Sequence, residues 1–166
     1  MRLLKKVTAG IMVAICVVSM SIPVHAASGY AKKNMKSSYS YTQYNCTFWG
    51  QSNFWDVWWG ADGTSKTVWI GSNPFNADSI THKDILSCTG IGSMDIGADI
   101  SSGGAGIGVS SSVSGHKATY TYSVSNKWNI NVDFNYKHTG LLAAWNFDMD
   151  TKSVVQFGSS FYTWGT

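Results

Sequence analysis

The strongest constraint on this chain is a strict alternation of apolar and polar residues in its C-terminal half. The pattern occupies 118–124, 128–136, 141–149 and 153–164, with the short polar segments "SNK", "HTG" and "DTK" between these stretches. Successive side chains of a strand point to opposite faces of a sheet, so a period of two predicts strands with one apolar face. Strands at this regular spacing, joined by polar turns, predict an antiparallel meander.

The residue types that are missing support the same fold class. Residues 27–166 contain no Arg and no Glu, and their only leucines are Leu86, Leu141 and Leu142. Good helix formers are therefore scarce, whereas Gly, Ser, Thr, Asn, Tyr and Trp are abundant. We expect one all-β domain over 39–166. Because a single sheet would leave its apolar face in water, that domain should be a β-sandwich or a small barrel.

The first 26 residues have the three parts of a secretory signal peptide. Arg2, Lys5 and Lys6 precede an apolar run over 7–20, and "SIPVHA" supplies small residues at Val24 and Ala26 for cleavage. The alternative is a retained membrane anchor, although the apolar run is short for a spanning helix. We therefore predict a secreted, extracellular protein, of bacterial origin. Residues 27–38 are polar without periodicity, and we expect them to form a flexible N-terminal arm.

The charge balance argues against nucleic acid as a partner. The formal net charge of +3 comes from Arg2, Lys5 and Lys6, so the remainder of the chain is close to neutral. Proteins that bind nucleic acid usually carry a basic stripe that is rich in Arg. We expect no nucleic-acid binding.

Two cysteines lie outside the predicted signal peptide, Cys46 and Cys88. Two cysteines in a secreted chain most simply form one disulfide. The alternative is a pair of free, buried thiols. The sequence has no cysteine cluster with the spacing of a metal site, and we expect neither a metal nor a cofactor.

The densest aromatic stretch is "TFWGQSNFWDVWWG" at 47–60, and it is followed by Asp62-Gly63, a common turn pair. We expect a hairpin with strands over 54–59 and 67–70. A period of two puts Trp55, Val57 and Trp59 on one face and Phe54, Asp56 and Trp58 on the other. The purely apolar set should face the core. Phe54, Asp56 and Trp58 are then candidate binding residues, with Trp58 as the exposed ring.

A second amphipathic pair of strands is expected between Met94 and Gly115, with "SSGG" as its turn. Its apolar residues are Met94, Ile96, Ala98, Ile100, Ala105, Ile107, Val109 and Val113. In alternation, strand length and short turn, this segment resembles the inserting hairpin of β-barrel pore-forming toxins. The resemblance implies a partner membrane and an oligomer on it. The same pattern also fits an ordinary half-buried hairpin.

Candidate catalytic residues are few. Asp95 and Asp99 share a strand face, and Asp148 and Asp150 flank Met149. Either pair has the residue types of a glycosidase, and the second has oxygens for a calcium ion. The alternative is that all four are ordinary surface aspartates. Of the histidines, His116 and His138 lie in apparent turns, where a solvated side chain is usual. We assign no catalytic residue.

These observations favour a secreted, non-enzymatic protein that binds an extracellular surface, either membrane lipid or cell-envelope glycan. An antimicrobial or pore-forming role is the sharper form of this hypothesis. Two alternatives stay open: a small secreted hydrolase that uses Asp carboxylates, and a matrix protein that self-associates through edge strands.

Overall fold

The computed structural model describes residues 25–35, 38–52, 57–71, 76–96 and 106–166, and the protein is built from β-strands. The strands are β1 (His25–Met35), β2 (Ser38–Ser52), β3 (Val57–Gly71), β4 (Ala77–Ile96), β5 (Gly108–Ser114), β6 (Lys117–Lys127), β7 (Asn129–Phe157) and β8 (Ser160–Gly165). No helix with the length and apolar character of a membrane span occurs among the described residues. The all-β prediction is confirmed, whereas the meander predicted for the C-terminal half is wrong, because β6 pairs with β4 and β5 and the first half of β7 pairs with β3.

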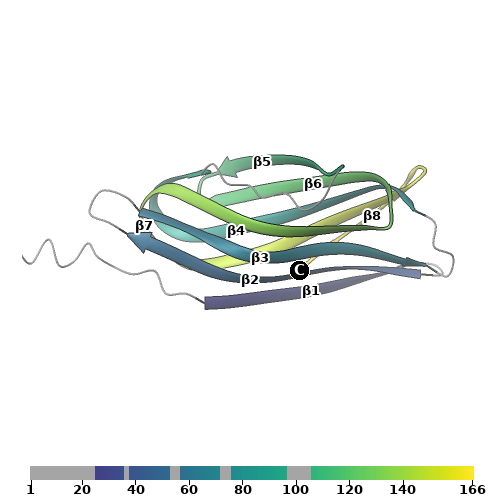
Figure 1. The fold of residues 1–166 in the computed structure, drawn as a ribbon, viewed down its shortest axis with the longest axis horizontal. Helices are drawn as coiled ribbons and strands as arrows, with labels where there is room; N and C mark the ends of the chain where they lie inside the picture. The colour runs from purple at the N-terminus through teal and green to yellow at the C-terminus, as the bar shows by residue number, and fades with distance from the viewer. Residues whose placement is uncertain (1–24, 36–37, 53–56, 72–75, 97–105) are drawn as a thin grey trace, which may run out of the picture.

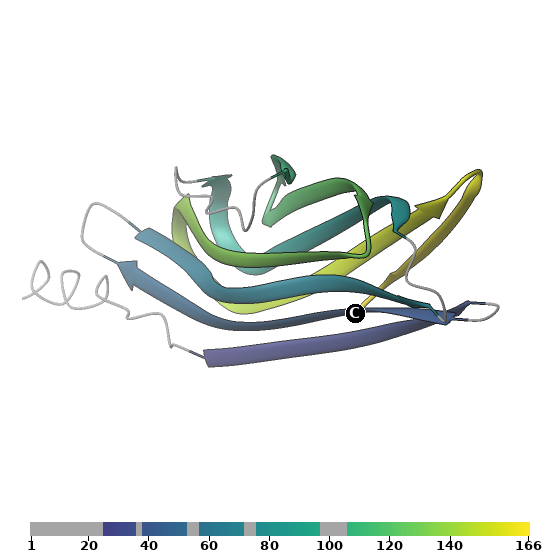
Figure 2. The same ribbon diagram turned by 45° about the vertical axis from the view of Figure 1, so that its right-hand side comes forward.

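The strands form two antiparallel layers that share one long strand. Their order is β1-β2-β3-β7-β4-β6-β5, and β8 pairs with β7. β7 turns back on itself, so its first half pairs with β3 and its second half with β4 and β8 (Figure 1). The first layer is therefore β1, β2, β3 and the first half of β7. The second layer is β8, the second half of β7, β4, β6 and β5, and the two layers face each other as a sandwich (Figure 2).

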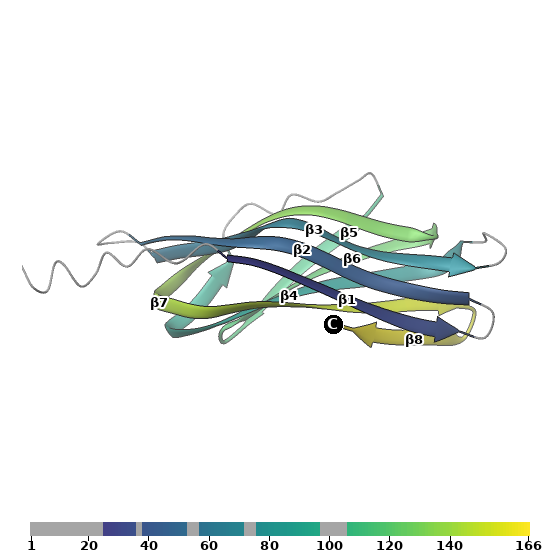
Figure 3. The same ribbon diagram turned by 90° about the horizontal axis from the view of Figure 1, so that it is seen from below.

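The bend of β7 closes one end of the sandwich. Gly140 has a φ of 90°, and a Cβ there would lie 2.6 Å from the carbonyl oxygen of Ser93 on β4. Only glycine fits this close approach. The end of β4 follows the bend, since Asp95 pairs with Thr139 and Ile96 with His138. At the side of the sandwich, the edge strands β1 and β8 lie beside each other (Figure 3).

The core between the layers changes character along its length. Near the bend of β7 it is aromatic, with Trp59, Phe48 and Phe147 in ring contact. Toward the other end it contains aliphatic residues such as Ile80 and Val155. Buried polar side chains fill the middle: Ser40, Thr42, Ser65, Thr67, His82, Asp84, Thr151 and Ser153. The two apolar ends are therefore joined by a polar middle section.

The turn predicted at Asp62-Gly63 is wrong, because β3 runs straight through it. Gly63 pairs with Cys46 on β2 and Phe134 on β7, and a Cβ at Gly63 would lie 2.1 Å from the carbonyl oxygen of Asn45. Glycine occupies position 63 because the backbones of neighbouring strands are in close contact there, and not because the chain turns. The turn predicted at 150–152 is wrong for a similar reason, since Thr151 pairs with Asp84 in mid-strand and the chain turns at Gly158 instead.

The stretch expected to be a flexible arm is an edge strand. Most of it forms β1, which pairs with β2 from His25 opposite Phe48 to Met35 opposite Ser38. Its polar side chains reflect an edge position with much of the strand in solvent. Residues 1–24 lie outside the described residues. The cleavage site predicted after Ala26 falls within β1 and stays a prediction.

The predicted disulfide between Cys46 and Cys88 is wrong, because both are free cysteines with buried side chains. Cys46 lies on β2 in the first layer, whereas Cys88 lies on β4 in the second layer. A bridge requires Cα atoms within about 7 Å and Cβ atoms that point toward each other. Each thiol instead packs as a small apolar group in the shared core.

Candidate functional site

The sequence predicted three binding residues in the aromatic stretch 47–60. The structure describes one of them, Trp58, whereas Phe54 and Asp56 lie outside the described residues. Trp58 is half-buried on the solvent side of the first layer. Its ring meets Trp49 edge-on, with 5.2 Å between centroids, and the ammonium of Lys137 lies 4.8 Å from it. Trp59 is fully buried, as the alternation predicted.

The structure describes only the two ends of the segment predicted as a membrane hairpin. The backbone N–H of Met94 donates a hydrogen bond to the carbonyl oxygen of Gly115 at 3.3 Å, while the end of β4 pairs with β7 and β5 pairs with β6. Met94 is buried, Val109 is exposed, and Ile96, Ile107 and Val113 pack partly against the core. Ala98, Ile100 and Ala105 lie outside the described residues. Because residues 97–105 lie outside the described residues, the predicted hairpin stays a prediction.

The predicted carboxylate pairs do not form an enclosed site among the described residues. Asp148 and Asp150 are exposed on the outer side of the second layer, and Oδ1 of Asp148 accepts a hydrogen bond from the backbone N–H of Met149. Partial burial and then the charge of Asp148 raise the pKa of Asp150, which Lys117 partly offsets. Asp95 is exposed, and Asp99 is not described. The described residues contain no group of three or more His, Cys, Asp or Glu suited to a metal ion.

A serine, a histidine and an aspartate do meet, in the polar middle of the core. Nε2 of His82 lies 2.9 Å from Oγ of Ser65 and 2.8 Å from Oδ1 of Asp84, and Oγ of Ser65 donates to Oδ2 of Asp84 at 2.8 Å. A catalytic triad needs the nucleophile and the carboxylate on different ring nitrogens. Here both use Nε2, while Nδ1 lies 2.7 Å from Thr67.

Burial decides the role of this polar group. Ser65 is 2% exposed, and His82 and Asp84 are 0% exposed, so no substrate reaches them in this fold. Tyr136 donates a further hydrogen bond to Asp84, and its own hydroxyl meets that of Tyr122 at 2.6 Å. Oδ1 of Asp84 pairs with His82 on the same strand, and the other hydrogen bonds of this set join residues of different strands. The group joins the two layers, and His82 is a structural residue.

A different candidate site lies on the solvent side of the first layer. There β1, β2, β3 and β7 carry mostly polar side chains in register. The cross-strand rows are Ala26-Thr47-Asp62-Asn135, Ser28-Asn45-Thr64-Asp133 and Tyr30-Gln43-Lys66-Asn131. We call these three rows the polar strip. The inward neighbours of these residues fill the core, so the strip faces outward along its whole length.

Two hollows follow the polar strip. The larger, of about 520 Å³, is lined by residues of β1, β2 and β3, including Ser28, Thr47 and Asp62. The smaller, of about 240 Å³, is lined by residues of β2, β3 and β7. Asn45 and Thr64 line both, so the two hollows adjoin at the centre of the strip. Amide, hydroxyl and carboxylate groups there offer hydrogen-bond donors and acceptors side by side.

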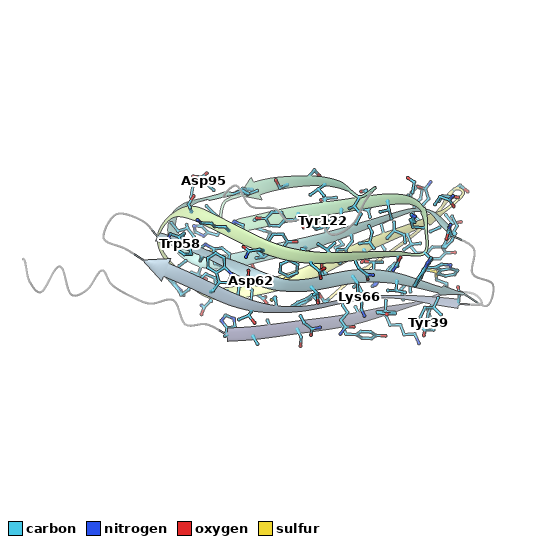
Figure 4. All side chains as sticks on the ribbon, viewed as in Figure 1. Tyr39, Trp58, Asp62, Lys66, Asp95 and Tyr122 are labelled. Carbon is cyan, nitrogen blue, oxygen red and sulfur yellow. The ribbon has the colours of Figure 1, made fainter. Side chains whose placement is uncertain are left out.

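Aromatic clusters lie at both ends of the polar strip, and the one at the tyrosine end shares Tyr30 and Lys66 with its last row. The tryptophan cluster, Trp49 and Trp58 with Lys137, is at the end near the bend of β7. The tyrosine cluster at the other end contains Tyr30, Tyr39 and Tyr41 with Lys32 and Lys66. Its members contact one another in ring pairs and cation–π contacts. Figure 4 shows Trp58, Asp62, Lys66 and Tyr39 following one another along this layer.

The charges of this face alternate. Lys137 lies at the tryptophan end, Asp62 and Asp133 lie in the middle, and Lys66 and Lys32 lie toward the tyrosine end. Each lysine ammonium is also held over an aromatic ring, between 4.1 Å and 5.5 Å from its centroid. No single sign of charge therefore dominates the face, which is unlike a surface that attracts polyanions.

The sequence did not predict the polar strip, because its rows are defined by the register between paired strands. The outward residues of 129–137, such as Asn131 and Asp133, were visible as the polar half of an alternation. Which residues of β2 and β3 lie beside them depends on pairing between strands far apart in the chain. The run of Asn and Asp on one strand face was the one available signal.

Comparisons with known proteins do not assign the chain to a family. The chain matches no model of a known protein family, and no curated protein is significantly similar to it in sequence.

Proposed function

We propose that the protein binds a glycan of a cell envelope through the polar strip and its flanking aromatic clusters. The observation that carries the proposal is the pair of adjoining hollows centred on Asn45 and Thr64. Sugars present many hydroxyl groups, each both donor and acceptor, and the amide, hydroxyl and carboxylate side chains of the strip are matched to them. Sugars also have flat C–H faces that pack on aromatic rings such as Tyr30.

The charges of this face favour a glycan over a lipid surface. Binding to anionic lipid headgroups depends on clustered Lys or Arg without acidic neighbours. On this face Asp62 and Asp133 lie between Lys137 and Lys66. A neutral, hydroxyl-rich ligand suits such mixed charges. The predicted signal peptide fits the same proposal, since a secreted protein meets cell-envelope polymers directly.

The test is a titration of the purified protein with peptidoglycan, chitin, β-glucan and mannan, followed by tryptophan fluorescence and calorimetry. Asn45→Ala and Thr64→Ala remove exposed side chains and leave the core intact. Each variant is expected to lower the affinity for the bound polysaccharide about tenfold, the equivalent of one lost hydrogen bond. Thr121→Ala on β6, on the outer side of the second layer, is the matched control and should bind like the wild type. Absence of binding to all four polymers, or unchanged affinity in both strip variants, would refute the proposal.

One observation favours a second candidate function, which is insertion into membranes. β5 pairs with β6 along one side, and six of its seven residues are exposed. An edge strand with few buried contacts detaches at low cost, which a segment that inserts into lipid must do. Leakage of dye from phosphatidylcholine–phosphatidylglycerol vesicles, blocked by a cysteine pair that fixes Ser112 to Thr119, would support it. Vesicles that retain their dye would exclude it.

A further inference from the structure

We infer that the ligand is a linear polymer that lies along the strands of the first layer and contacts both aromatic clusters at once. This inference rests on the proposed function and adds the form of the ligand. The two clusters lie on the same face of the first layer, one at each end of the polar strip, and both include residues of β2 and β3. A ligand centred on Asn45 and Thr64 reaches both clusters only by extending along the strands.

The distance between the clusters sets the size of the ligand. Trp49 pairs with Gly60 on β3, and Tyr41 pairs with Val68 on the same strand. Residues 60 and 68 of an extended strand are on the order of 25 Å apart, at about 3.3 Å per residue. A single sugar or a disaccharide covers only a fraction of this length. A linear chain of several sugars spans it.

The path between the clusters is continuous. The larger hollow ends at Asn45 and Thr64, where the smaller hollow begins, so a ligand in one continues into the other. The smaller hollow is lined by Gln43 and Lys66, and Lys66 reaches over the ring of Tyr41 in the tyrosine cluster. The polar side chains that can bind sugar hydroxyls are thus followed directly by aromatic rings on which sugar faces can pack.

The tryptophan cluster is held rigidly. A Cβ at Gly60 would lie 2.6 Å from Cζ2 of Trp49, so the glycine leaves room for the indole ring directly on the strand. Trp58 stands against this ring at an interplanar angle of 76°. At the other end, Tyr30 is 58% exposed and stacks on Tyr41 with 5.6 Å between centroids. A fixed platform loses little conformational entropy when a ligand packs on it.

The experiment uses size-fractionated fragments of whichever of the four polysaccharides binds the protein. We expect the affinity to rise at least about tenfold between the disaccharide and fragments long enough to reach both clusters, because each cluster adds its own contacts. Tyr30→Ala should lower the affinity for the long fragments more than the affinity for the disaccharide, and so remove much of that gain. Trp58→Phe, which keeps a ring in the fold, should reduce the gain in the same way.

Phe161→Ala is the matched control, since Phe161 is an exposed ring on β8 in the second layer. It should bind all fragments like the wild type. Equal affinity for short and long fragments would overturn the linear-polymer inference and leave glycan binding intact. A gain with length that survives in both Tyr30→Ala and Trp58→Phe would also overturn it. Absence of binding to every polysaccharide would refute the proposed function itself.

Discussion

The hydroxyl of Tyr136 on β7 donates a hydrogen bond of 2.5 Å to Oδ2 of Asp84 on β4, and both side chains are fully buried. The bond joins the first layer to the second. Burial, and then the negative charge of Asp84, raises the pKa of Tyr136, so its hydroxyl stays protonated and acts as the donor. Asp84 also accepts from Ser65 and His82, which gives a buried carboxylate three partners.

Removing that donor should destabilise the protein without emptying the core. Tyr136→Phe keeps the ring that stacks between Tyr120 and Phe134 but leaves Asp84 one partner short. We expect the free energy of unfolding to fall by about 2–3 kcal/mol, as for a hydrogen bond to a charged group. Urea unfolding measures it. Tyr162→Phe on β8 is the control, and an equal loss there would argue against a special role for Tyr136.

Acid should weaken the fold through His138. Burial lowers the pKa of His138 to about 4, from an ordinary value of 6.5. Below pH 6.5 the unfolded chain therefore binds a proton that the folded protein does not bind until about pH 4. His138 therefore leaves the free energy of unfolding unchanged above pH 6.5. Between pH 6.5 and pH 4 it lowers the free energy of unfolding by about 3 kcal/mol. Urea unfolding across this range should show a shallower fall for His138→Phe than for the wild type; parallel curves would contradict the assignment.

The two core thiols should be unreactive until the protein unfolds. Burial raises the pKa of Cys46 and of Cys88 to about 11, and the thiolate is the reactive form. We expect no reaction with a thiol reagent at pH 8 in the native protein and reaction of both residues in denaturant. Reducing agent should leave the melting temperature unchanged, because Cys46 and Cys88 form no bridge. A fall in melting temperature on reduction would show that Cys46 and Cys88 are bridged and would contradict this prediction.

The close contact at Gly63 should make this position intolerant of any side chain. In Gly63→Ala the new Cβ meets the backbone of Asn45 and Cys46, so β2 and β3 must move apart. We expect a loss of more than about 3 kcal/mol, or failure to fold. Gly108→Ala on β5 is the control, since the nearest atom to its Cβ would be 3.7 Å away. If the two variants had comparable free energies of unfolding in urea, β2 and β3 would accommodate a side chain at position 63, and the prediction would be wrong.

The alternation identified the core face of several strands correctly. Tyr120, Tyr122, Ile130, Val132 and Phe134 all face inward and are buried, as a period of two predicts. Trp128 departs from the pattern, because it lies between β6 and β7 and is 51% exposed. Local periodicity is reliable where a strand is regular and its two faces differ strongly in polarity.

Other features depend on contacts that no local pattern contains. His82 and Asp84 look like surface residues in the sequence, yet they are buried because Ser65, Thr67 and Tyr136 satisfy them from other strands. Gly63 looks like a turn and is a contact between backbones. The polar strip likewise exists only once β2, β3 and β7 are in register, so the sequence singled out Trp58 but not the polar residues that lie along the same face.

The bend of β7 has a consequence for how the chain acquires its structure. β7 supplies a partner strand to both layers and lies late in the sequence, so neither layer is complete until residues 129–157 are available. Pairing of this kind joins segments that are far apart in the chain, which slows folding. A nascent chain therefore cannot complete either layer until residues 129–157 have been synthesised. Until then one edge of β3 and one edge of β4 each lack the strand that pairs beside them.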